Sequence, residues 1–301
     1  MNATADSLRH IEHVMGTAIS IDIRTPLPAA GAIVEVLAWL HHVDETFSTY
    51  KQNSEISRFG RGELSITDLS TETEDVLLHC LELTEFTNGA FDAFAVPAPN
   101  GTNLDPSGYV KGWAVERAAC ILEAAGARNL CINAGGDIVL RGTPGADHGW
   151  RVGIRHPDEP LQQAAIITVA GTIAIATSAT YERGAHIIDP RTGEPTTDLA
   201  SVTVVGPDLG AADAYATAVF VMGFDGLDWM EAQPGYDAYI ITRDQTAFWT
   251  SGFPPHTGAQ SGASLGPTSS EREQGPPNSL DAQPRITLLG PRINRSRSPG
   301  D

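Results

Sequence analysis

The sequence has few basic residues compared with acidic ones, and this imbalance excludes some partners. Nineteen Lys and Arg residues against 37 Asp and Glu residues give a formal net charge of −18. Such a charge repels nucleic acids and anionic membrane surfaces. We therefore expect no nucleic-acid partner, and an anionic ligand would need a local cation to hold it.

Cysteine is also scarce. The three cysteines are Cys80, Cys120 and Cys131, an odd number at wide spacing, and each lies in an apolar stretch. This pattern is typical of buried thiols and argues against a disulfide framework or a zinc site. Free thiols of this kind are expected in a protein of a reducing compartment.

Long hydrophobic runs are missing as well. The longest uncharged stretch, residues 161–181, contains Gln, Thr and Gly and has the composition of β-strands, so no membrane span is predicted. The first sixteen residues lack a basic segment followed by an apolar core, and no cysteine before Cys80 could carry a lipid. From these features we expect a cytoplasmic protein without a membrane anchor.

Hydrophobic patterning predicts helices separated from a series of hairpin-linked strands, which indicates an α+β fold. Helices are expected over 30–43, 72–86, 108–125 and 211–222, the last apolar nearly all round. Strands are expected over 14–24, 129–133, 137–141, 150–155, 164–169, 173–177, 186–189, 201–205, 237–242 and 246–250. Residues 1–252 form the predicted folded domain, and 253–301, rich in Pro, Gly, Ser and charge, are expected to be a disordered tail.

The common cofactor signatures GxGxxG, GxxxxGK[ST], CxxC and HExxH do not occur. What remains are short clusters of glycine with polar residues. In LDPSGYVKG, Asp105 and Lys111 flank a turn that opens a helix, a combination that attracts phosphate. The alternative is a simple helix cap.

In AADAYATAV, Asp213 and Thr217 are four residues apart, so a helix places both on one face. A carboxylate and a hydroxyl there could bind a hard cation such as Mg²⁺. The alternative is an Asp near a helix start and a Thr bonded to its own backbone.

Three further clusters each allow a functional and a purely structural interpretation. In HIIDPRTGEP, His186 could accept a proton near neutral pH, or it could satisfy a carbonyl. TNGAFDAF offers aromatic surface and an acceptor for a heteroaromatic base, or is local core. In INAGGDIVLRG, Gly135 and Gly136 allow close backbone approach to a ligand, or form a tight hairpin with Asp137 orienting the turn.

Taken in order, the motifs resemble those of the ApbE-type FAD:protein FMN transferases over nearly all of residues 14–252. The matching segments are MGTAISI (15–21), FSTYKQNSEISRFG (47–60), TNGAFDAF (87–94), LDPSGYVKGWAVE (104–116), INAGGDIVLRG (132–142), WRVGI (150–154), ATSATYERG (176–184), HIIDPRTGEP (186–195) and SVTVVGP…AADAYATAVFVMG (201–223).

The resemblance implies a reaction in which FAD is split at its pyrophosphate, AMP leaves, and FMN is esterified to a Ser or Thr hydroxyl of an acceptor protein. It implies an FAD site in a cleft between two subdomains, with mixed or antiparallel sheets and packed helices. Mg²⁺ would be held by the side chains of Asp213 and Thr217 and the carbonyl of Gly108. Positions matching residues near the flavin nucleotide are Met15, Tyr50, Ala90, Phe91, Asp92, Asp105, Lys111, Gly135, Gly136 and Ile188. The HxxDP motif makes His186 the candidate proton acceptor, and Asp213 is counted as catalytic with it.

Some positions depart from the family pattern. Pro106 and Ser107 replace the more frequent Leu and Gly, Glu116 replaces Asp, and Gly210 stands where some members carry another acidic residue near the metal. Many members are exported lipoproteins, a signal not seen here. Two other functions stay open, namely FAD binding without catalysis and hydrolysis of FAD to FMN and AMP.

The acceptor and the oligomeric state, monomer or dimer, are also left open by the sequence. Within the expected tail, QSGAS (260–264) resembles the context of the family's acceptor hydroxyls. Ser264 could therefore be a self-acceptor, although a Ser/Gly-rich segment produces such strings by chance.

Overall fold

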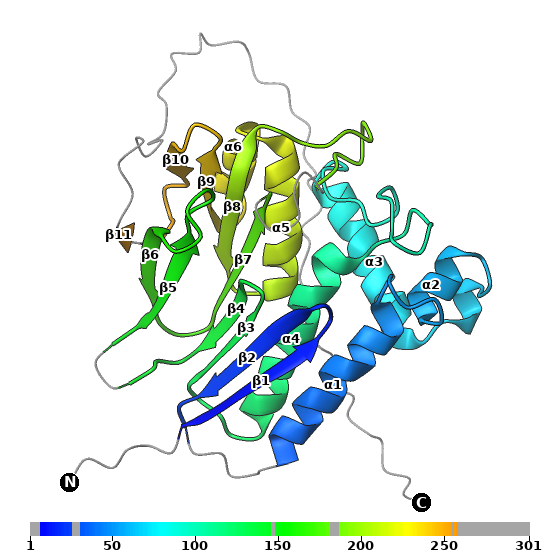
Figure 1. Cartoon of the computed structure of the whole chain (residues 1–301), viewed down its shortest axis with the longest axis horizontal. Helices are drawn as coiled ribbons and strands as arrows, with labels where there is room; N and C mark the ends of the chain where they lie inside the picture. The colour runs from blue at the N-terminus through cyan, green and yellow to red at the C-terminus, as the bar shows by residue number, and fades with distance from the viewer. Residues whose placement is uncertain (1–6, 26–30, 146–147, 181–186, 255, 258–301) are drawn as a thin grey trace, which may run out of the picture. The chain divides into compact units, whose positions relative to one another are not determined.

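A computed structural model describes residues 7–25, 31–145, 148–180, 187–254 and 256–257. Its centre is an eight-stranded sheet with the order β1-β2-β3-β4-β7-β8-β9-β10, in which every strand pair is antiparallel (Figure 1). The strands are β1 (Leu8–Val14), β2 (Thr17–Ile23), β3 (Leu130–Ala134), β4 (Asp137–Arg141), β7 (Ile173–Ala179), β8 (Leu199–Gly206), β9 (Asp237–Thr242) and β10 (Ala247–Trp249).

Helices cover one face of this sheet, and α4 and α5 lie directly against it (Figure 1). The helices are α1 (Gly31–Phe47), α2 (Glu55–Gly60), α3 (Thr71–Phe86), α4 (Ser107–Ala124), α5 (Leu209–Met222) and α6 (Asp225–Glu231), with a short 3₁₀ turn at Ile66–Asp68. Helix α5 begins where the Asp208 side chain accepts a hydrogen bond from the Ala211 amide at 2.8 Å, and it ends at Gly223 with φ 67°. Twelve of its fourteen residues are buried, so its position is set by packing on all sides.

A smaller sheet covers the opposite face. It has the order β11-β6-β5, formed by β5 (Trp150–Arg155), β6 (Gln163–Val169) and β11 (His256–Thr257). Side chains such as Trp150, Ile154 and Ile167 pack there against Ile138 and Ile175 of the large sheet. Because β4 is covered on both faces, all five of its residues are buried, and a charged residue on it must find a partner inside the protein.

The α+β class is confirmed, and most expected elements are present within two or three residues of their predicted ends. The strand expected over 14–24 is present as β2, but it begins three residues later than predicted, because Val14 ends β1 and Met15 and Gly16 form the turn of a β1–β2 hairpin. Strand β1 lies at the edge of the sheet and has alternating exposed residues. Its charged side chains break the apolar pattern, so the sequence did not predict it. Over 187–189 the structure has one isolated bridge, between Ile188 and Pro195, in place of a strand.

Ordered contacts continue beyond Gly252, the predicted end of the folded domain. Phe253 is buried in the core between the two sheets, and β11 pairs with β6. The rest of the expected tail, including Ser264, lies outside the described residues. No helix within the described ranges combines the length and the apolar character needed to cross a membrane.

Candidate functional site

Three charged side chains from three different elements meet on the helix-covered face of the sheet. Lys111 comes from the start of α4, Asp137 is the first residue of β4, and Asp213 lies in the first half of α5. The Lys111 Nζ pairs with Asp137 Oδ2 and lies 3.7 Å from Asp213 Oδ2. The side chains of the two carboxylates are 2% and 5% exposed, whereas that of Lys111 is 34% exposed. A partly accessible ammonium group is therefore shared by two buried carboxylates.

Close helix packing creates this meeting point. A Cβ atom on Gly112 would lie 2.4 Å from the Leu209 carbonyl oxygen, so only glycine permits α4 and α5 to approach this closely. Asp137 is fixed from the other side, because its Oδ1 accepts a hydrogen bond from the Thr177 amide of β7 at 3.0 Å. The sequence did not single out Gly112, and it gave Asp137 a different role.

The cluster contains two carboxyl groups and one ammonium group. Burial raises the pKa of Asp213 above its ordinary value; the neighbouring Lys111 opposes this shift and Asp137 adds to it. Among the described residues, the buried Oδ2 of Asp213 has no hydrogen-bond partner. A buried acceptor of this kind is costly unless a cation approaches it.

Oxygen donors surround the next turn of α5. Thr217 lies one turn after Asp213, and its Oγ1 is 3.2 Å from Ser178 Oγ of β7. A Cβ atom built on Gly108 would lie 3.7 Å from Thr217 Oγ1 and 3.2 Å from Phe91 Cε2. Gly108, Phe91 and Thr217, which were expected at one site, are thus neighbours, and Ser178, from the matching segment 176–184, is an addition.

This donor set suits a hard divalent cation. Carboxylate, hydroxyl and carbonyl oxygens are the ligands that Mg²⁺ prefers, usually completed by water or substrate phosphate. Within the described ranges, no group of three His, Cys, Asp or Glu side chains is arranged to hold a metal. Any ion at Asp213 would therefore need hydroxyl, carbonyl and ligand oxygens in addition to the single carboxylate.

The turn after α3 is rigid and mostly buried. Ala90 and Phe91 are 0% and 4% exposed, and the Phe91 amide donates to Thr87 Oγ1 at 3.0 Å. The carboxylate of Asp92 accepts from the Phe94 amide at 2.8 Å. Ala90 and Phe91 therefore form part of the local core, which agrees with the structural interpretation of TNGAFDAF. Their contact with a nucleotide stays a prediction.

Asp105 serves the backbone at the start of α4. Its Oδ1 accepts a hydrogen bond from the Ser107 amide at 3.0 Å, and its own amide donates to the Ala93 carbonyl at 2.8 Å. Asp105 thus binds the first amide of α4, although the N-cap position itself is Pro106 and makes no side-chain cap bond. The bond to Ala93 joins this helix start to the turn after α3.

The loop that follows His186 packs near the same turn. Arg191 donates to both carboxylate oxygens of Asp189, at 2.9 and 2.8 Å, and this pairing lowers the pKa of Asp189. Arg191 Cγ lies 3.5 Å from the position that a Cβ on Gly89 would take. Ile188 is held by its bridge to Pro195, whereas His186 itself lies outside the described residues.

Two further predicted nucleotide contacts lie on other segments. Met15 occupies the β1–β2 turn with φ 54° and is partly buried against the core. Tyr50 follows α1 and is 75% exposed, so its ring is available to a ligand.

The glycine turn has a structural explanation of its own. Gly135 and Gly136 have φ values of 63° and 108°, and a Cβ on Gly135 would lie 2.6 Å from Thr17 Oγ1. The Gly136 amide donates to Asn133 Oδ1 at 2.9 Å, so Asn133 orients the turn and Asp137 faces Lys111. Tight hairpin geometry accounts for both glycines, and their approach to a nucleotide stays a prediction.

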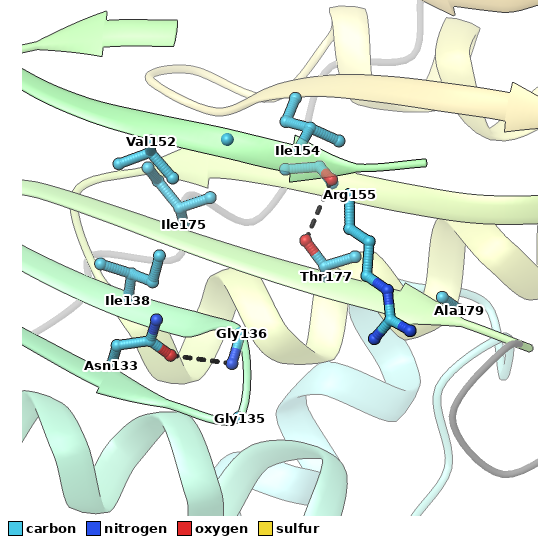
Figure 2. Close-up of a pocket in the computed structure, with 12 residues that line it drawn as sticks. Asn133, Gly135, Gly136, Ile138, Val152, Ile154, Arg155, Ile175, Thr177 and Ala179 are labelled. Atoms are coloured by element: carbon cyan, nitrogen blue, oxygen red, sulfur yellow. Dashed lines mark hydrogen bonds between the residues drawn. The ribbon is translucent and has the colours of Figure 1, made fainter. Parts of the chain in front are cut away.

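A hollow of about 250 Å³ lies on the other face of β4 and β7, between the two sheets (Figure 2). Its walls include Gly136, Ile138, Ile175 and Thr177 of the large sheet and Arg155 of β5. Because Asp137 pairs with Lys111 on the helix face, the sheet separates this hollow from the charged cluster.

Comparison with known proteins gives consistent results. The ApbE family model matches residues 15–100 and 95–240. The FAD:protein FMN transferase of Rhodobacter capsulatus is 33% identical over 235 residues, which cover 74% of this chain and 40% of that protein. The one from Vibrio cholerae is 30% identical over 242 residues, covering 63% and 72%.

Solved structures agree with this. The flavin transferase ApbE from Vibrio cholerae superposes with a TM-score of 0.71 at 26% identity, covering 85% of this chain and 98% of that one. The ApbE protein from Thermotoga maritima has a TM-score of 0.71 at 22% identity, covering 80% and 96%, and supports the fold alone.

Proposed function

The chain belongs to the ApbE family, and we propose on this basis that it transfers FMN from FAD to a Ser or Thr hydroxyl of an acceptor protein and releases AMP. The observation that carries the proposal is the cluster of Lys111, Asp213 and Thr217, in which an orphaned, buried carboxylate oxygen lies beside an ammonium group. Such a cluster suits a diphosphate bound together with a divalent cation.

In this proposal, Asp213, Thr217 and the carbonyl of Gly108 hold Mg²⁺. When bound, the ion would supply charge neutralisation at the phosphate oxygens that become more negative during transfer. Lys111 adds a second positive charge at the same place, which resolves how a chain of net charge −18 binds an anionic dinucleotide.

The remaining predicted contacts position the flavin nucleotide. Ala90 and Phe91 supply a rigid wall, because they are buried and held by Thr87. The exposed ring of Tyr50 is suited to stacking on a heteroaromatic ring. Met15, Asp92, Asp105, Gly135, Gly136 and Ile188 complete the proposed set.

The chemistry requires an in-line hydroxyl and a proton acceptor. The acceptor hydroxyl oxygen forms a bond to the phosphorus of the FMN phosphate, the bond from this phosphorus to the bridging oxygen breaks, and AMP leaves. We assign removal of the hydroxyl proton to His186. A cytoplasmic location stays a prediction from the sequence.

The test combines purified protein, FAD, Mg²⁺ and a peptide that presents a Ser or Thr. The proposal predicts a peptide whose mass has increased by one FMN minus water, with one AMP released for each adduct. Release of AMP without an adduct would indicate FAD hydrolysis, and retention of FAD with neither product would indicate a binding protein.

Two variants assign the roles. Asp213→Ala should abolish transfer, whereas Asp22→Asn, at a β2 carboxylate that pairs with Arg24, should leave it unchanged. His186→Ala should lower kcat more than it weakens FAD binding, and equal losses in both would contradict its role as proton acceptor.

A further inference from the structure

Asp137 is a buried charged residue that the proposed reaction does not use. It is 1% exposed, at the start of a strand that is covered on both faces. Its Oδ1 accepts a hydrogen bond from the Thr177 amide at 3.0 Å, and its Oδ2 is in ion-pair contact with Lys111. A buried charge held this firmly in a strand requires a reason.

We propose that Asp137 is a positioning residue that holds the ammonium group of Lys111 away from Asp213, and so keeps Asp213 available to a divalent cation. The inference rests on the proposed function, because it deepens the role of the same site. Asp137 itself acts through Lys111 and need not touch the metal or the nucleotide.

The distances support this division of partners. Lys111 Nζ is in direct contact with Asp137, whereas it lies 3.7 Å from Asp213 Oδ2, beyond hydrogen-bonding distance. Both Oδ2 atoms are buried and have no hydrogen-bond partner among the described residues, but only that of Asp137 is in direct contact with the ammonium group. Lysine has a flexible four-carbon stem, so without Asp137 its ammonium group would move to the nearest remaining carboxylate, which is Asp213.

Charge leads to the same conclusion. With both carboxylates and Lys111 ionised, the cluster carries one net negative charge, which attracts a cation. Removal of the Asp137 charge leaves Lys111 and Asp213 as a neutral pair, in which the ammonium group competes with the metal for the same oxygen. Asp137 is therefore expected to strengthen metal binding although it is not a ligand.

A double-mutant cycle separates positioning from a structural role, with Mn²⁺ as the probe and no turnover required. Free Mn²⁺ is measured by electron paramagnetic resonance during titration of the protein without FAD. Asp137→Asn should raise the Kd for Mn²⁺ at least about tenfold. Lys111→Met should not raise it, because it removes the competing cation.

The double variant Asp137→Asn with Lys111→Met is decisive. It restores the single net negative charge of the cluster, so its Kd for Mn²⁺ should return to within about threefold of the wild-type value, well short of the roughly tenfold loss in Asp137→Asn alone. A purely structural Asp137 would leave the double variant as weak as Asp137→Asn, and that result would overturn the proposal. Unchanged Mn²⁺ binding in Asp137→Asn would overturn it as well.

Controls keep the result independent of folding and of the reaction. Asp137→Ser replaces Asp137→Asn if the latter does not fold, as judged by its thermal transition, and the same restoration by Lys111→Met is expected. Asp22→Asn should leave Mn²⁺ binding unchanged.

The peptide flavinylation assay is run separately, so wild-type protein that binds Mn²⁺ at Asp213 without transferring FMN contradicts the proposed function and leaves the cycle interpretable. Wild-type protein that binds no Mn²⁺ overturns the positioning role.

Discussion

Arg141 on β4 and Glu116 on α4 form a largely buried ion pair, which joins the same strand and helix as the pair of Asp137 and Lys111 with the charges exchanged. Glu116 also accepts a hydrogen bond from the Leu209 amide at 3.4 Å, at the start of α5. The second pair therefore ties together the three elements that carry the candidate site. This gives Glu116, which replaces the family's frequent Asp, a clear structural role.

Arg141→Ala should destabilise the protein by about 3 kcal/mol, because it leaves the carboxylate of Glu116 buried without its partner. The Arg141 side chain is 4% exposed and that of Glu116 is 17% exposed, so solvent can replace little of the lost interaction. Urea unfolding measures the change. Arg117→Ala, in an exposed residue of the same helix, should change stability by less than about 0.5 kcal/mol, and similar losses in both variants would contradict this assignment.

The same pair predicts a pH dependence. Burial raises the pKa of Glu116 in the folded protein, with Arg141 opposing the shift. A raised pKa in the folded state means that the stability contributed by this group is fully present below its unfolded pKa of about 4.3 and is lost as the pH rises through the folded value. The free energy of unfolding of the wild type, relative to that of Glu116→Gln, should therefore be higher at pH 4 than at pH 7. Urea midpoints that differ by the same amount at both pH values would contradict the prediction.

Thr217→Val tests the hydroxyl that is expected to bind the metal. The change removes Oγ1 and preserves the shape of the side chain, and loss of one such oxygen should raise the Mg²⁺ concentration for half-maximal transfer about tenfold. Thr203→Val is the matched control, because Thr203 is buried and its hydroxyl lies 3.0 Å from Thr177 Oγ1, away from the charged cluster. Equal metal requirements in the two variants would exclude Thr217 as a ligand.

Gly135→Ala separates turn geometry from nucleotide binding. Its φ of 63° and the Thr17 Oγ1 atom at 2.6 Å from the new Cβ should together cost about 2 kcal/mol of stability. Thr17→Ala should recover the steric part in the double variant. At Gly136 an added Cβ meets no atom within 4 Å, so Gly136→Ala carries backbone strain alone. If the turn also approaches FAD, Gly136→Ala will raise the KM for FAD, and an unchanged KM would restrict both glycines to the hairpin.

The parts of the fold that local patterns determine could be predicted from the sequence. Helices α3 and α4 and strands β4 and β5 have clear periodicity and were placed within one residue of their observed ends. Strand β1 was missed, because an edge strand exposes polar residues and lacks the apolar pattern of a covered one.

Local sequence patterns likewise predict only some of the neighbours within the candidate site. Asp213 and Thr217 could be paired from sequence, because four residues make one helical turn. The contact of Lys111 with Asp137 joins α4 to β4 across 26 positions, and Asp213 comes near both through the close approach of α4 and α5 at Gly112. No local pattern encodes either contact. Ser178 lies in the matching segment ATSATYERG (176–184), yet its place beside Thr217 depends on the pairing of β7 with the sheet and on its packing under α5.

The most direct test of the central claim is the position of a divalent ion in crystals grown with FAD and Mn²⁺, located by its anomalous scattering. The account predicts one strong peak about 2.1 Å from oxygens of both Asp213 and Thr217 and in contact with the diphosphate. A peak elsewhere, with these two side chains distant from every phosphate oxygen, would contradict it.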